Sequence, residues 1–447
     1  MSRRNVHLIL AVMLISLVCY QKAGTARNRQ ADTFVEAMNT IEQAYLEPVD
    51  RRTLFEAAMK GMTSVLDPHS SYIPPRDYSE FQVNLEQEFG GIGIQVTVDE
   101  DKRLTVLSPL VGTPAYEAGV LAGDKILAID GKSTEGYGIE DAVKLLRGNP
   151  GKIVTLTVRH QGEESPVEIP IERAVIQIET VLGDTHNADG SWNFFLEGYP
   201  HLGYVRVTSF SERTADELRT AINTLLEGGM QGLILDLRNN PGGLLQTAIE
   251  VCDMFIDKGR IVSTRGRKGV VREVANAHAA GTFHQDFPLA VLVSRYSASA
   301  SEIVAACLQD HHRAVIVGER TFGKGTVQNL IPLEQGRSAL KLTIASYWRP
   351  SGKNIDRKKG DPEDADWGVT PDKGYHLKLS DEQMRKLIEW RRRRDIVGRP
   401  KAPADQDADQ VLLSEIDPQL QRAIDYVKQS TSHNSQAKVA ETQNPGG

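Results

Sequence analysis

Between residues 174 and 375 the chain alternates apolar strand patterns with amphipathic helix patterns, and this alternation restricts the possible folds more than any other feature. Short apolar runs such as "QGLILDLRNN", "PLAVLVSR" and "RAVIVGE" are separated by helical patterns such as "TADELRTAINTLLEGG" and "ASEIVAACLQD". Strands that alternate with helices form largely parallel sheets covered by those helices. The pattern therefore predicts an α/β layer fold, in which ligand sites gather at the carboxyl ends of the strands.

Three loops in this region follow predicted strands and carry residues that suggest chemistry. The first, "DLRNNPGG" (236–243), could present backbone N–H groups to an oxyanion, because its glycines free the backbone and a helix follows. It could equally be an ordinary tight turn between a strand and a helix. The second loop contains "SASASE" (297–302), in which one serine could be a nucleophile. The third, "GERTFGKG" (318–325), places a lysine between glycines but lacks the phosphate-binding P-loop pattern.

A nucleophilic serine needs a base, and the sequence offers two kinds. His311 and His312 end a helix in "QDHHRAV", where a cation suits the helix dipole, and no GxSxG motif supports a serine–histidine hydrolase. Lys324 is the alternative. Its ordinary pKa of about 10.4 leaves it protonated at pH 7, so it would act as a base only where burial lowers that pKa.

Residues 83–173 form a separate, β-rich segment of about 90 residues, which is a usual size for a domain. "GGIGIQVTV" and "RLTVLSPL" have strand patterns, and "IEDAVKLLRG" is an amphipathic helix in which Ile139, Val143 and Leu146 share one face.

The N-terminus predicts export across a membrane. Two arginines precede an apolar run over residues 6–20, and small residues follow before residue 27. The run is short for a membrane-spanning helix and typical of an export signal. Residues 1–26 are therefore expected to be a cleaved signal peptide or a retained anchor, which would place the chain in the periplasm or on a membrane facing it.

The segments on either side of these two regions are helical. In residues 31–82, Phe34, Met38 and Ile41 share the apolar face of a first helix, and Asp50 is a candidate cap of a second. Residues 376–447 contain a charged helix whose arginine run, 391–394, suggests a solvated surface. A short helix capped by Asp417 follows, and the polar chain from Gln429 onward is expected to be disordered.

Composition excludes several other classes. The net charge of −7, from 52 basic and 59 acidic residues, gives no basic footprint for nucleic acid. Three cysteines, Cys19, Cys252 and Cys307, form neither a disulfide framework nor a metal-ligand pattern. No metal and no other cofactor is expected, and the oligomeric state is left open.

In this order, "DLRNNPGG", "SASASE" and "GERTFGKGTVQ" resemble the motifs of the carboxy-terminal processing (tail-specific) serine peptidases. Residues 83–173 resemble the PDZ domain that these enzymes carry. The resemblance extends from about residue 32 to residue 375 and includes "DPHSSYIP". One departure is Arg295-Tyr296, where many members have a glycine before the first serine.

The resemblance implies a fold class and a domain order. It implies an α/β peptidase core of the crotonase/ClpP-like kind, with an inserted PDZ domain and N-terminal helices. The expected segments are a signal peptide or anchor (1–26), an N-terminal helical segment (31–82), a PDZ domain (83–173), a serine peptidase core (174–375), and charged C-terminal helices with a disordered tail (376–447).

The resemblance also assigns roles to single residues. It makes Ser299 the nucleophile and Lys324 its base, so that Ser297 and Ser301 would only pack or cap. Glu302 would either support the site or merely stabilise the first turn of its helix. The remaining assignments are Gln328, which would orient the lysine, and the N–H groups of Gly243 and Ala300, which would form the oxyanion hole.

A PDZ domain binds a C-terminal peptide as an added strand at a sheet edge. The resemblance places the peptide carboxylate at the "GGIGI" loop and the last side chain in an apolar pocket. The residues so assigned are Gly91, Ile92, Gly93, Ile94, Val143 and Leu146.

These features together imply an exported serine endopeptidase with a Ser–Lys dyad, which cleaves proteins near unstructured C-terminal tails presented by the PDZ domain. Its partners would be protein or peptide substrates, with the N-terminus as a possible membrane anchor. The alternative is an inactive scaffold that binds C-terminal peptides through the PDZ domain. A third possibility is a conventional serine hydrolase that uses a histidine such as His311.

Overall fold

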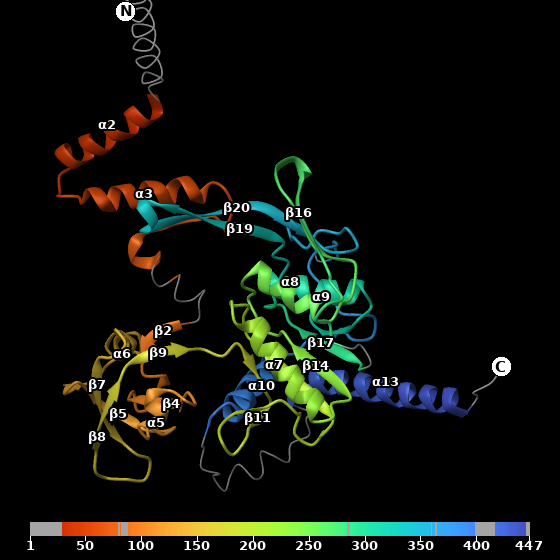
Figure 1. The fold of residues 1–447 in the computed structure, drawn as a ribbon. Coiled ribbons are helices and arrows are strands. Elements are labelled where there is room, and N and C mark those ends of the chain that lie inside the picture. Colours follow the sequence, from red (N-terminus) through yellow and green to blue (C-terminus); the bar gives the residue numbers. More distant parts are fainter. Residues whose placement is uncertain are drawn as a thin grey trace, which may run out of the picture. The chain divides into compact units, whose positions relative to one another are not determined.

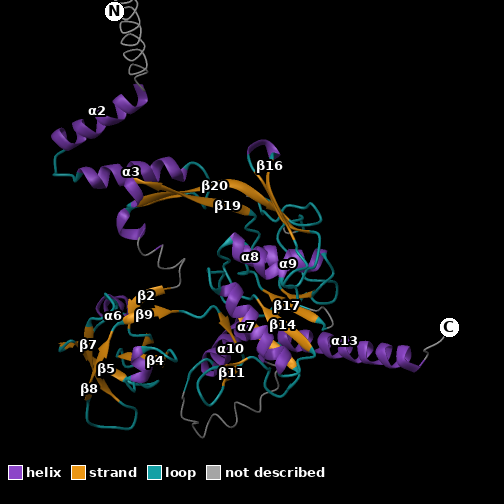
Figure 2. Cartoon of the chain, viewed as in Figure 1, coloured by secondary structure: helices purple, strands orange, loops and turns teal. Residues whose placement is uncertain are grey.

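The computed structural model describes residues 29–78, 81, 88–283, 287–358, 360–362, 364–397 and 416–443 (Figures 1 and 2). The predicted leader lies outside the described residues. No helix within the described ranges is long and apolar enough to cross a membrane. The chain divides into two compact units, Met1–Tyr78 with Gln328–Thr343, and Ser79–Val327 with Ile344–Gly447.

The smaller unit combines the N-terminal helices with the outer part of a hairpin. Helices α2 (Arg29–Ala44) and α3 (Arg51–Ser64) precede β1 (Ser71–Ile73), and β1 pairs antiparallel with β20 (Ser338–Trp348), the partner of β19 (Thr326–Leu333). As predicted, Asp50 caps α3, since its carboxylate accepts a hydrogen bond from the Thr53 N–H at 3.0 Å. Residues 328–343, which belong to the expected peptidase core, thus pack with the N-terminal helices.

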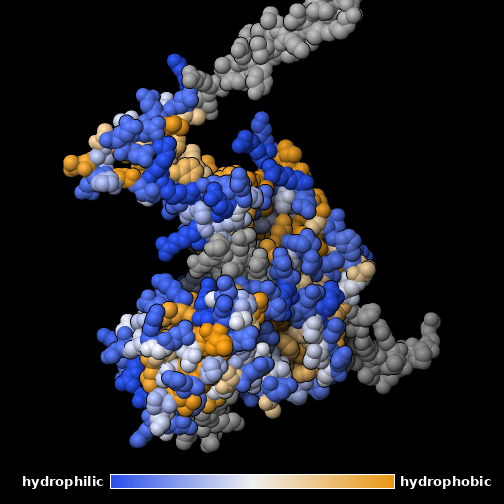
Figure 3. Space-filling view, turned by 60° about the vertical axis from the view of Figure 1, so that its left-hand side comes forward, coloured by the Kyte–Doolittle hydropathy of each residue, from blue (hydrophilic) through white to orange (hydrophobic). Residues whose placement is uncertain are grey.

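The apolar face expected on the first helix is only partly covered. Met38 is buried, whereas Phe34 and Ile41 are each more than 40% exposed. Figure 3 shows apolar surface interspersed with charged groups on the described part of this end of the chain.

Residues 88–177 form the β-rich part of the larger unit. Strands β2 (Glu88–Gly91) and β9 (Ala174–Gln177) pair where the chain enters and leaves it. The main sheet has the order β3 (Ile94–Val98), β4 (Leu104–Pro109), β5 (Lys125–Ile129), β7 (Ile153–Arg159) and β8 (Val167–Glu172), with β6 (Lys132–Ser133) beside β5. Two helices complete it, α5 (Pro114–Glu117) and α6 (Ile139–Leu146).

The rest of the larger unit is built on a mainly parallel sheet of order β10-β13-β14-β17-β18. Its strands are β10 (Val181–Leu182), β13 (Leu202–Val207), β14 (Gly232–Asp236), β17 (Leu289–Val293) and β18 (Val315–Gly318). The last four are parallel, and β10 is antiparallel to β13. Every residue of β14 and β17 is buried, which explains their unbroken apolar runs. The predicted α/β fold is therefore confirmed.

Helices cover both faces of this sheet. Alternate strand residues such as Leu233, Leu235 and Val291 pack with α7 (Thr214–Glu227), α8 (Leu245–Asp253) and α9 (Ala300–Asp310). The intervening residues, among them Ile234 and Leu292, pack with α13 (Pro418–Gln443). The last helix of the chain is thus one layer of the core.

Helix α13 differs from what the sequence suggested. A short helix after Asp417 and a disordered tail from Gln429 were expected, but the helix continues to Gln443. Its buried residues Leu420, Ala423, Ile424 and Val427 recur with helical spacing and contact the sheet. Packing against the sheet stabilises a helix whose own sequence is too polar to indicate its length.

Smaller elements complete the larger unit. They are β11 (Thr185–His186), β12 (Trp192–Asn193), β15 (Arg260–Arg265), β16 (Val271–Asn276) and α10 (Asp381–Arg394). The inner end of β20 pairs with β15. Two 3-10 turns, Arg267–Gly269 and Glu334–Gly336, lie in the hairpins of the two units.

Two residues of the arginine run at the end of α10 are half-buried and paired, which corrects the expectation of a solvated surface. Arg391 and Arg394 each donate to the carboxylate of Asp184 at 2.8 Å, and Asp184 is fully buried. Residues three apart share one helix face, whereas Arg392 and Arg393 point to solvent. Burial raises the pKa of Asp184, but the two arginine charges lower it more, so the carboxylate is ionised.

Replacing Arg391 with methionine should lower the free energy of unfolding by about 3 kcal/mol, because Asp184 loses one of its two buried cations. Arg392→Met, on the exposed side of the same helix, should change it by less than about 0.5 kcal/mol. Urea unfolding of both variants measures this difference. Equal effects would show that the ion pairs of Asp184 with Arg391 and Arg394 contribute no more to stability than exposed charges do.

Candidate active site

Three loops meet at the carboxyl edge of the parallel sheet. They follow the adjacent strands β14, β17 and β18, as expected from the sequence. The Ala298 N–H donates to the carbonyl of Asn240 in the first loop at 3.0 Å. The Phe322 N–H in the third loop donates to the carbonyl of Ser297 at 3.0 Å. The second loop, which contains the three serines, is therefore bonded to both of its neighbours.

Ser299 lies on a strained turn between β17 and α9. Its φ of 56° and ψ of −113° are unusual for a residue with a side chain, and it precedes the first residue of α9. Such a conformation costs on the order of 1–3 kcal/mol and is kept only where the surroundings enforce it. A serine on a sharp strand-to-helix turn is the same backbone arrangement that exposes the nucleophile in other hydrolases.

The two neighbouring serines have other partners. The Ser297 hydroxyl donates to the Leu237 carbonyl at 2.8 Å, and the Ser301 hydroxyl donates to the Asn240 carbonyl at 3.0 Å. Both side chains are fully buried. They fasten the serine loop to the "DLRNNPGG" loop, so Ser299 alone of the three is placed for chemistry.

Glu302 joins the serine loop to the lysine loop. Its Oε2 accepts hydrogen bonds from the N–H of Ser299 at 2.9 Å and from the N–H of Lys324 at 2.8 Å. Because both nitrogens bond the same oxygen, the backbones of Ser299 and Lys324 lie close together. Its Oε1 accepts from the Gly323 N–H at 2.7 Å and from the Thr321 hydroxyl at 2.5 Å. Glu302 therefore contacts far more than the first turn of its own helix.

The environment of Glu302 opposes its charge. Burial raises the pKa of Glu302 from 4.5 to about 7, although its four hydrogen bonds favour the ionised form. All four partners of Glu302 are hydrogen-bond donors. The ionised carboxylate suits them because both of its oxygens only accept hydrogen bonds.

Stability should depend on pH through Glu302. Because its pKa is raised in the folded state, ionising it costs stability, and the free energy of unfolding should fall as pH rises from 4.5 to about 7. The decrease in the free energy of unfolding that is due to Glu302 amounts to about 3 kcal/mol. Urea unfolding from pH 5 to pH 8 should show it in the wild type and not in Glu302→Gln. Identical pH slopes in the two proteins would rule out the raised pKa.

Two N–H groups are available for an oxyanion next to Ser299. Among the described residues, neither the Ala300 N–H nor the Gly243 N–H has a hydrogen-bond acceptor. Ala300 begins α9, where the helix dipole favours negative charge. A Cβ on Gly242 would lie 2.8 Å from the Ser299 Cβ and 3.0 Å from the Ala300 nitrogen, so Gly242 lies directly against the serine turn, and Gly243 follows it in the chain.

Gly242→Ala should abolish most turnover. The added methyl group would overlap the Ala298 carbonyl oxygen at 2.7 Å, and the φ of 100° disfavours any side chain. Gly229→Ala is the control, because its φ of 80° is similarly strained but nothing lies within 4 Å of the new atom. Measuring turnover and thermal unfolding of both variants separates displacement of the glycine loop from the backbone strain that any side chain at a positive φ causes. Equal turnover in the two variants would mean that displacing the "DLRNNPGG" loop does not impair activity.

Tyr347 is a neighbour of Ser299 that sequence reasoning missed. It is buried, and the side chain of Ser299 is close enough to its hydroxyl to lower the pKa of the phenol, although burial raises that pKa more. Burial raises the pKa of Tyr347 to about 12, so the phenol stays protonated at neutral pH. Its N–H donates to the carbonyl of Gly325, next to Lys324, at 2.7 Å. Nothing in the local sequence around Tyr347 indicated that it would lie near Ser299.

Gln328 and Lys324 lie on different units. Lys324 is half-buried in the larger unit, and Gln328 belongs to the smaller one, where its amide donates to the Thr343 hydroxyl at 3.3 Å. The expected hydrogen bond between Gln328 and the lysine stays a prediction.

The fold excludes His311 as the base for Ser299. His311 caps the C-terminus of α9, whereas Ser299 lies at its N-terminus, about 16 Å away along the 11-residue helix. The His311 ring bonds the Arg260 carbonyl instead, at 2.7 Å.

The β-rich part offers an edge suited to an added strand. β3 is the first strand of its sheet, so its outer edge is unpaired among the described strands, and α6 contacts it. Ile94 on β3 and Val143 on α6 are half-buried, while Ile92 and Leu146 lie in the core beneath. Gly91 ends β2, and Gly93, with a φ of 79°, could not carry a Cβ because Thr113 would be 2.2 Å away.

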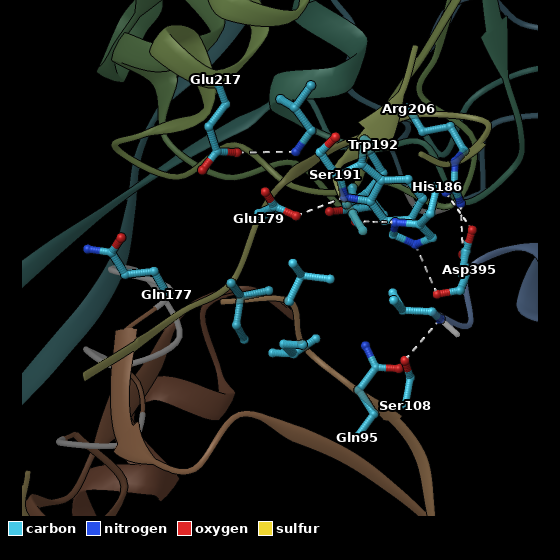
Figure 4. Close-up of a pocket in the computed structure, with 18 of the residues that line it drawn as sticks. Gln95, Ser108, Gln177, Glu179, His186, Ser191, Trp192, Arg206, Glu217 and Asp395 are labelled. Carbon is cyan, nitrogen blue, oxygen red and sulfur yellow. Dashed lines mark hydrogen bonds and ion pairs between the residues drawn. The ribbon is translucent and has the colours of Figure 1, made fainter. Parts of the chain in front are cut away.

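A cavity of about 1450 Å³ in the larger unit reaches the start of the "DLRNNPGG" loop, where Asp236, Arg238 and Asn239 line it; Figure 4 shows part of this cavity. Gln95 and Ser108 line it from the β-rich part, opposite Glu179, His186 and Trp192. None of the site residues assigned above lines it. Among its charged groups, Arg206 donates to the carboxylate of Asp395 at 2.6 Å. Within the described ranges no cluster of three or more His, Cys, Asp or Glu residues could hold a metal ion.

The strained serine, the buried glutamate and the unbonded N–H groups define a serine hydrolase site, and comparison with known proteins identifies its class. Residues 201–373 match the model of peptidase family S41, residues 105–160 match a PDZ domain, and residues 16–75 match the N-terminal domain of the activating protease CtpB. The molecule is a serine-type peptidase with a PDZ domain.

Individual relatives refine the class. The chain is 38% identical over 418 residues to a carboxy-terminal-processing protease of Bartonella bacilliformis, covering 88% of this chain and 90% of that one. It is 35% identical to the carboxy-terminal processing protease CtpA of Bacillus subtilis, covering 78% and 71%. A solved photosystem II D1 C-terminal processing protease is 30% identical, covers 80% and 95%, and has a TM-score of 0.44. The chain belongs to the carboxy-terminal processing proteases of family S41.

Proposed function

We propose that this peptidase cleaves exported proteins near unstructured C-terminal tails, with Ser299 as nucleophile and Lys324 as base. The observation that carries the proposal is the shared carboxylate oxygen of Glu302, which accepts the N–H groups of both residues. One rigid acceptor thus keeps the two backbones together, and both loops leave adjacent strands.

Lys324 takes the proton of the Ser299 hydroxyl while the serine oxygen attacks the peptide carbonyl. The N–H groups of Gly243 and Ala300 stabilise the negative oxygen of the tetrahedral intermediate. Lys324 then protonates the leaving amine, and water hydrolyses the acyl-enzyme. Lys324 has to be neutral to take this proton. Glu302 positions the backbones of both residues.

The PDZ domain presents the tail. The C-terminal residues of a substrate add to the free edge of β3 as a further strand, and their carboxylate binds at the "GGIGI" loop. Ile94 and Val143 contact the last side chain. A tail must be extended to pair in this way, which limits substrates to proteins with unstructured C-termini.

Ser299→Ala and Lys324→Ala should each reduce turnover of a protein with a disordered C-terminal tail by about 10³-fold or more. Ser301→Ala is the matched control, since that buried hydroxyl donates to the Asn240 carbonyl and has no proposed role in the reaction, and it should keep most of the activity. Mass spectrometry of the products measures cleavage and its position. Wild-type turnover in either dyad variant would refute the assignment.

The alternative is an inactive scaffold that binds C-terminal peptides. The wild-type protein would then bind the tailed substrate through the PDZ domain and leave it intact. The same mass-spectrometric experiment separates the two functions.

Export is a further part of the proposal. The arginines and apolar run of residues 1–26 support transfer across a membrane, with the peptidase in the periplasm or anchored facing it. Fusion of residues 1–30 to a reporter that is active only outside the cytoplasm would test this. Activity of the reporter supports export, and its absence excludes it.

A further inference from the structure

The loop that carries the oxyanion glycines is attached to the last helix of the chain through a buried arginine. Arg238 donates to both carboxylate oxygens of Asp417 at 2.8 Å, and its Nη2 donates to Asp236 at 2.6 Å. It also donates to the Gln419 side chain at 3.1 Å. The Arg238 side chain is 6% exposed and that of Asp417 is wholly buried. A bidentate ion pair of this kind fixes direction as well as distance.

Asp417 is itself held rigidly. It precedes the first residue of α13 and caps that helix, because its Oδ1 accepts from the Leu420 N–H at 2.9 Å. Leu420 and Ile424 pack beneath the parallel sheet. The Gln419 amide donates to the Leu377 carbonyl at 2.7 Å. The carboxylate of Asp417 therefore cannot follow Arg238 if the loop shifts.

A short covalent path connects Arg238 to the active site. Asn240, two residues on, accepts the Ala298 N–H and the Ser301 hydroxyl at its carbonyl, each at 3.0 Å. Its side chain accepts the Gly242 N–H at 2.8 Å. The orientation of Gly242 and Gly243 against Ser299 thus depends on where Arg238 is held.

The charges around Arg238 allow Asp417 to be neutralised without leaving the arginine unpaired. Burial alone would lower the pKa of Arg238, but the carboxylates of Asp236 and Asp417 raise it above its ordinary value. Asp236 also accepts the Tyr204 hydroxyl at 2.7 Å. If Asp417 were neutral, Arg238 would still be balanced by Asp236, so no uncompensated buried charge would remain.

We propose that Asp417 is a positioning residue of the peptidase reaction. Through its bidentate ion pair with Arg238 it holds the 238–243 loop where the Gly243 N–H meets the oxyanion. The C-terminal helix is then part of the catalytic apparatus although it does not touch the substrate. This inference rests on the proposed function of Ser299, Lys324 and the oxyanion N–H groups.

The test is Asp417→Asn in the full chain, assayed on the tailed substrate. Misplacement of an oxyanion donor should lower kcat about 10- to 100-fold and leave KM within about twofold, because the tail binds at the PDZ domain. A peptide aldehyde, which forms a tetrahedral adduct with the serine, should bind more weakly by a similar factor. The corresponding product acid should bind unchanged.

Three further variants keep the result interpretable. Asp417→Glu, which retains the charge, should recover part of kcat. Gln419→Leu removes one acceptor of Arg238 and should lower kcat a few-fold, which tests the proposal even if Asp417→Asn does not fold. Asp425→Asn, on the exposed side of the same helix, should behave as the wild type.

Wild-type kcat in folded Asp417→Asn and in Gln419→Leu would overturn the proposal. So would a loss of aldehyde and product affinity by the same factor, since that would indicate general unfolding. If Ser299→Ala or Lys324→Ala keeps wild-type turnover, the proposed function itself fails, whatever Asp417 does. A loss of kcat in Asp417→Asn with both dyad variants inactive supports the two proposals separately.

Discussion

The active site depends on one buried carboxylate. Glu302 is completely inaccessible, yet its two oxygens accept four hydrogen bonds from the serine loop and the lysine loop. Burying a carboxylate is costly unless it is fully hydrogen-bonded. The cost makes the arrangement specific, because any shift of either loop would leave a buried charge with fewer donors. The strained backbone of Ser299 is maintained in the same way, since the Ser299 N–H is one of those donors.

The glycine loop is fixed from two sides. On one side, the hydroxyls of Ser297 and Ser301 bond its carbonyls. On the other, Arg238 anchors it to Asp236 and to Asp417 at the start of α13. Hydrogen bonds therefore connect the oxyanion donors to an element that follows them by about 180 residues in the sequence. The same helix covers one face of the parallel sheet, so folding of the core and assembly of the site are coupled.

Binding and catalysis use different kinds of structure in this peptidase. The PDZ domain offers a free strand edge next to half-buried apolar side chains, and in the proposed function this edge binds an extended chain end. The three loops at the sheet edge offer fixed N–H groups and a strained serine, which in the proposed function stabilise a transition state. Each arrangement rests on its own core, because the PDZ domain has a separate hydrophobic cluster.

The sequence by itself determined the fold class, because alternating apolar strands and amphipathic helices between residues 174 and 375 allow few layer arrangements. It also singled out the three loops and, through their resemblance to a known family, Ser299 and Lys324. It could not indicate that Arg391 and Arg394 pair with Asp184, or that Tyr347 lies near Ser299, since these partners are distant in the chain. Only the tertiary structure decided what Glu302 and Asp417 contact. From the local sequence, each of the two is an acidic residue at the start of a helix. Their other partners lie in separate loops, which only folding brings together.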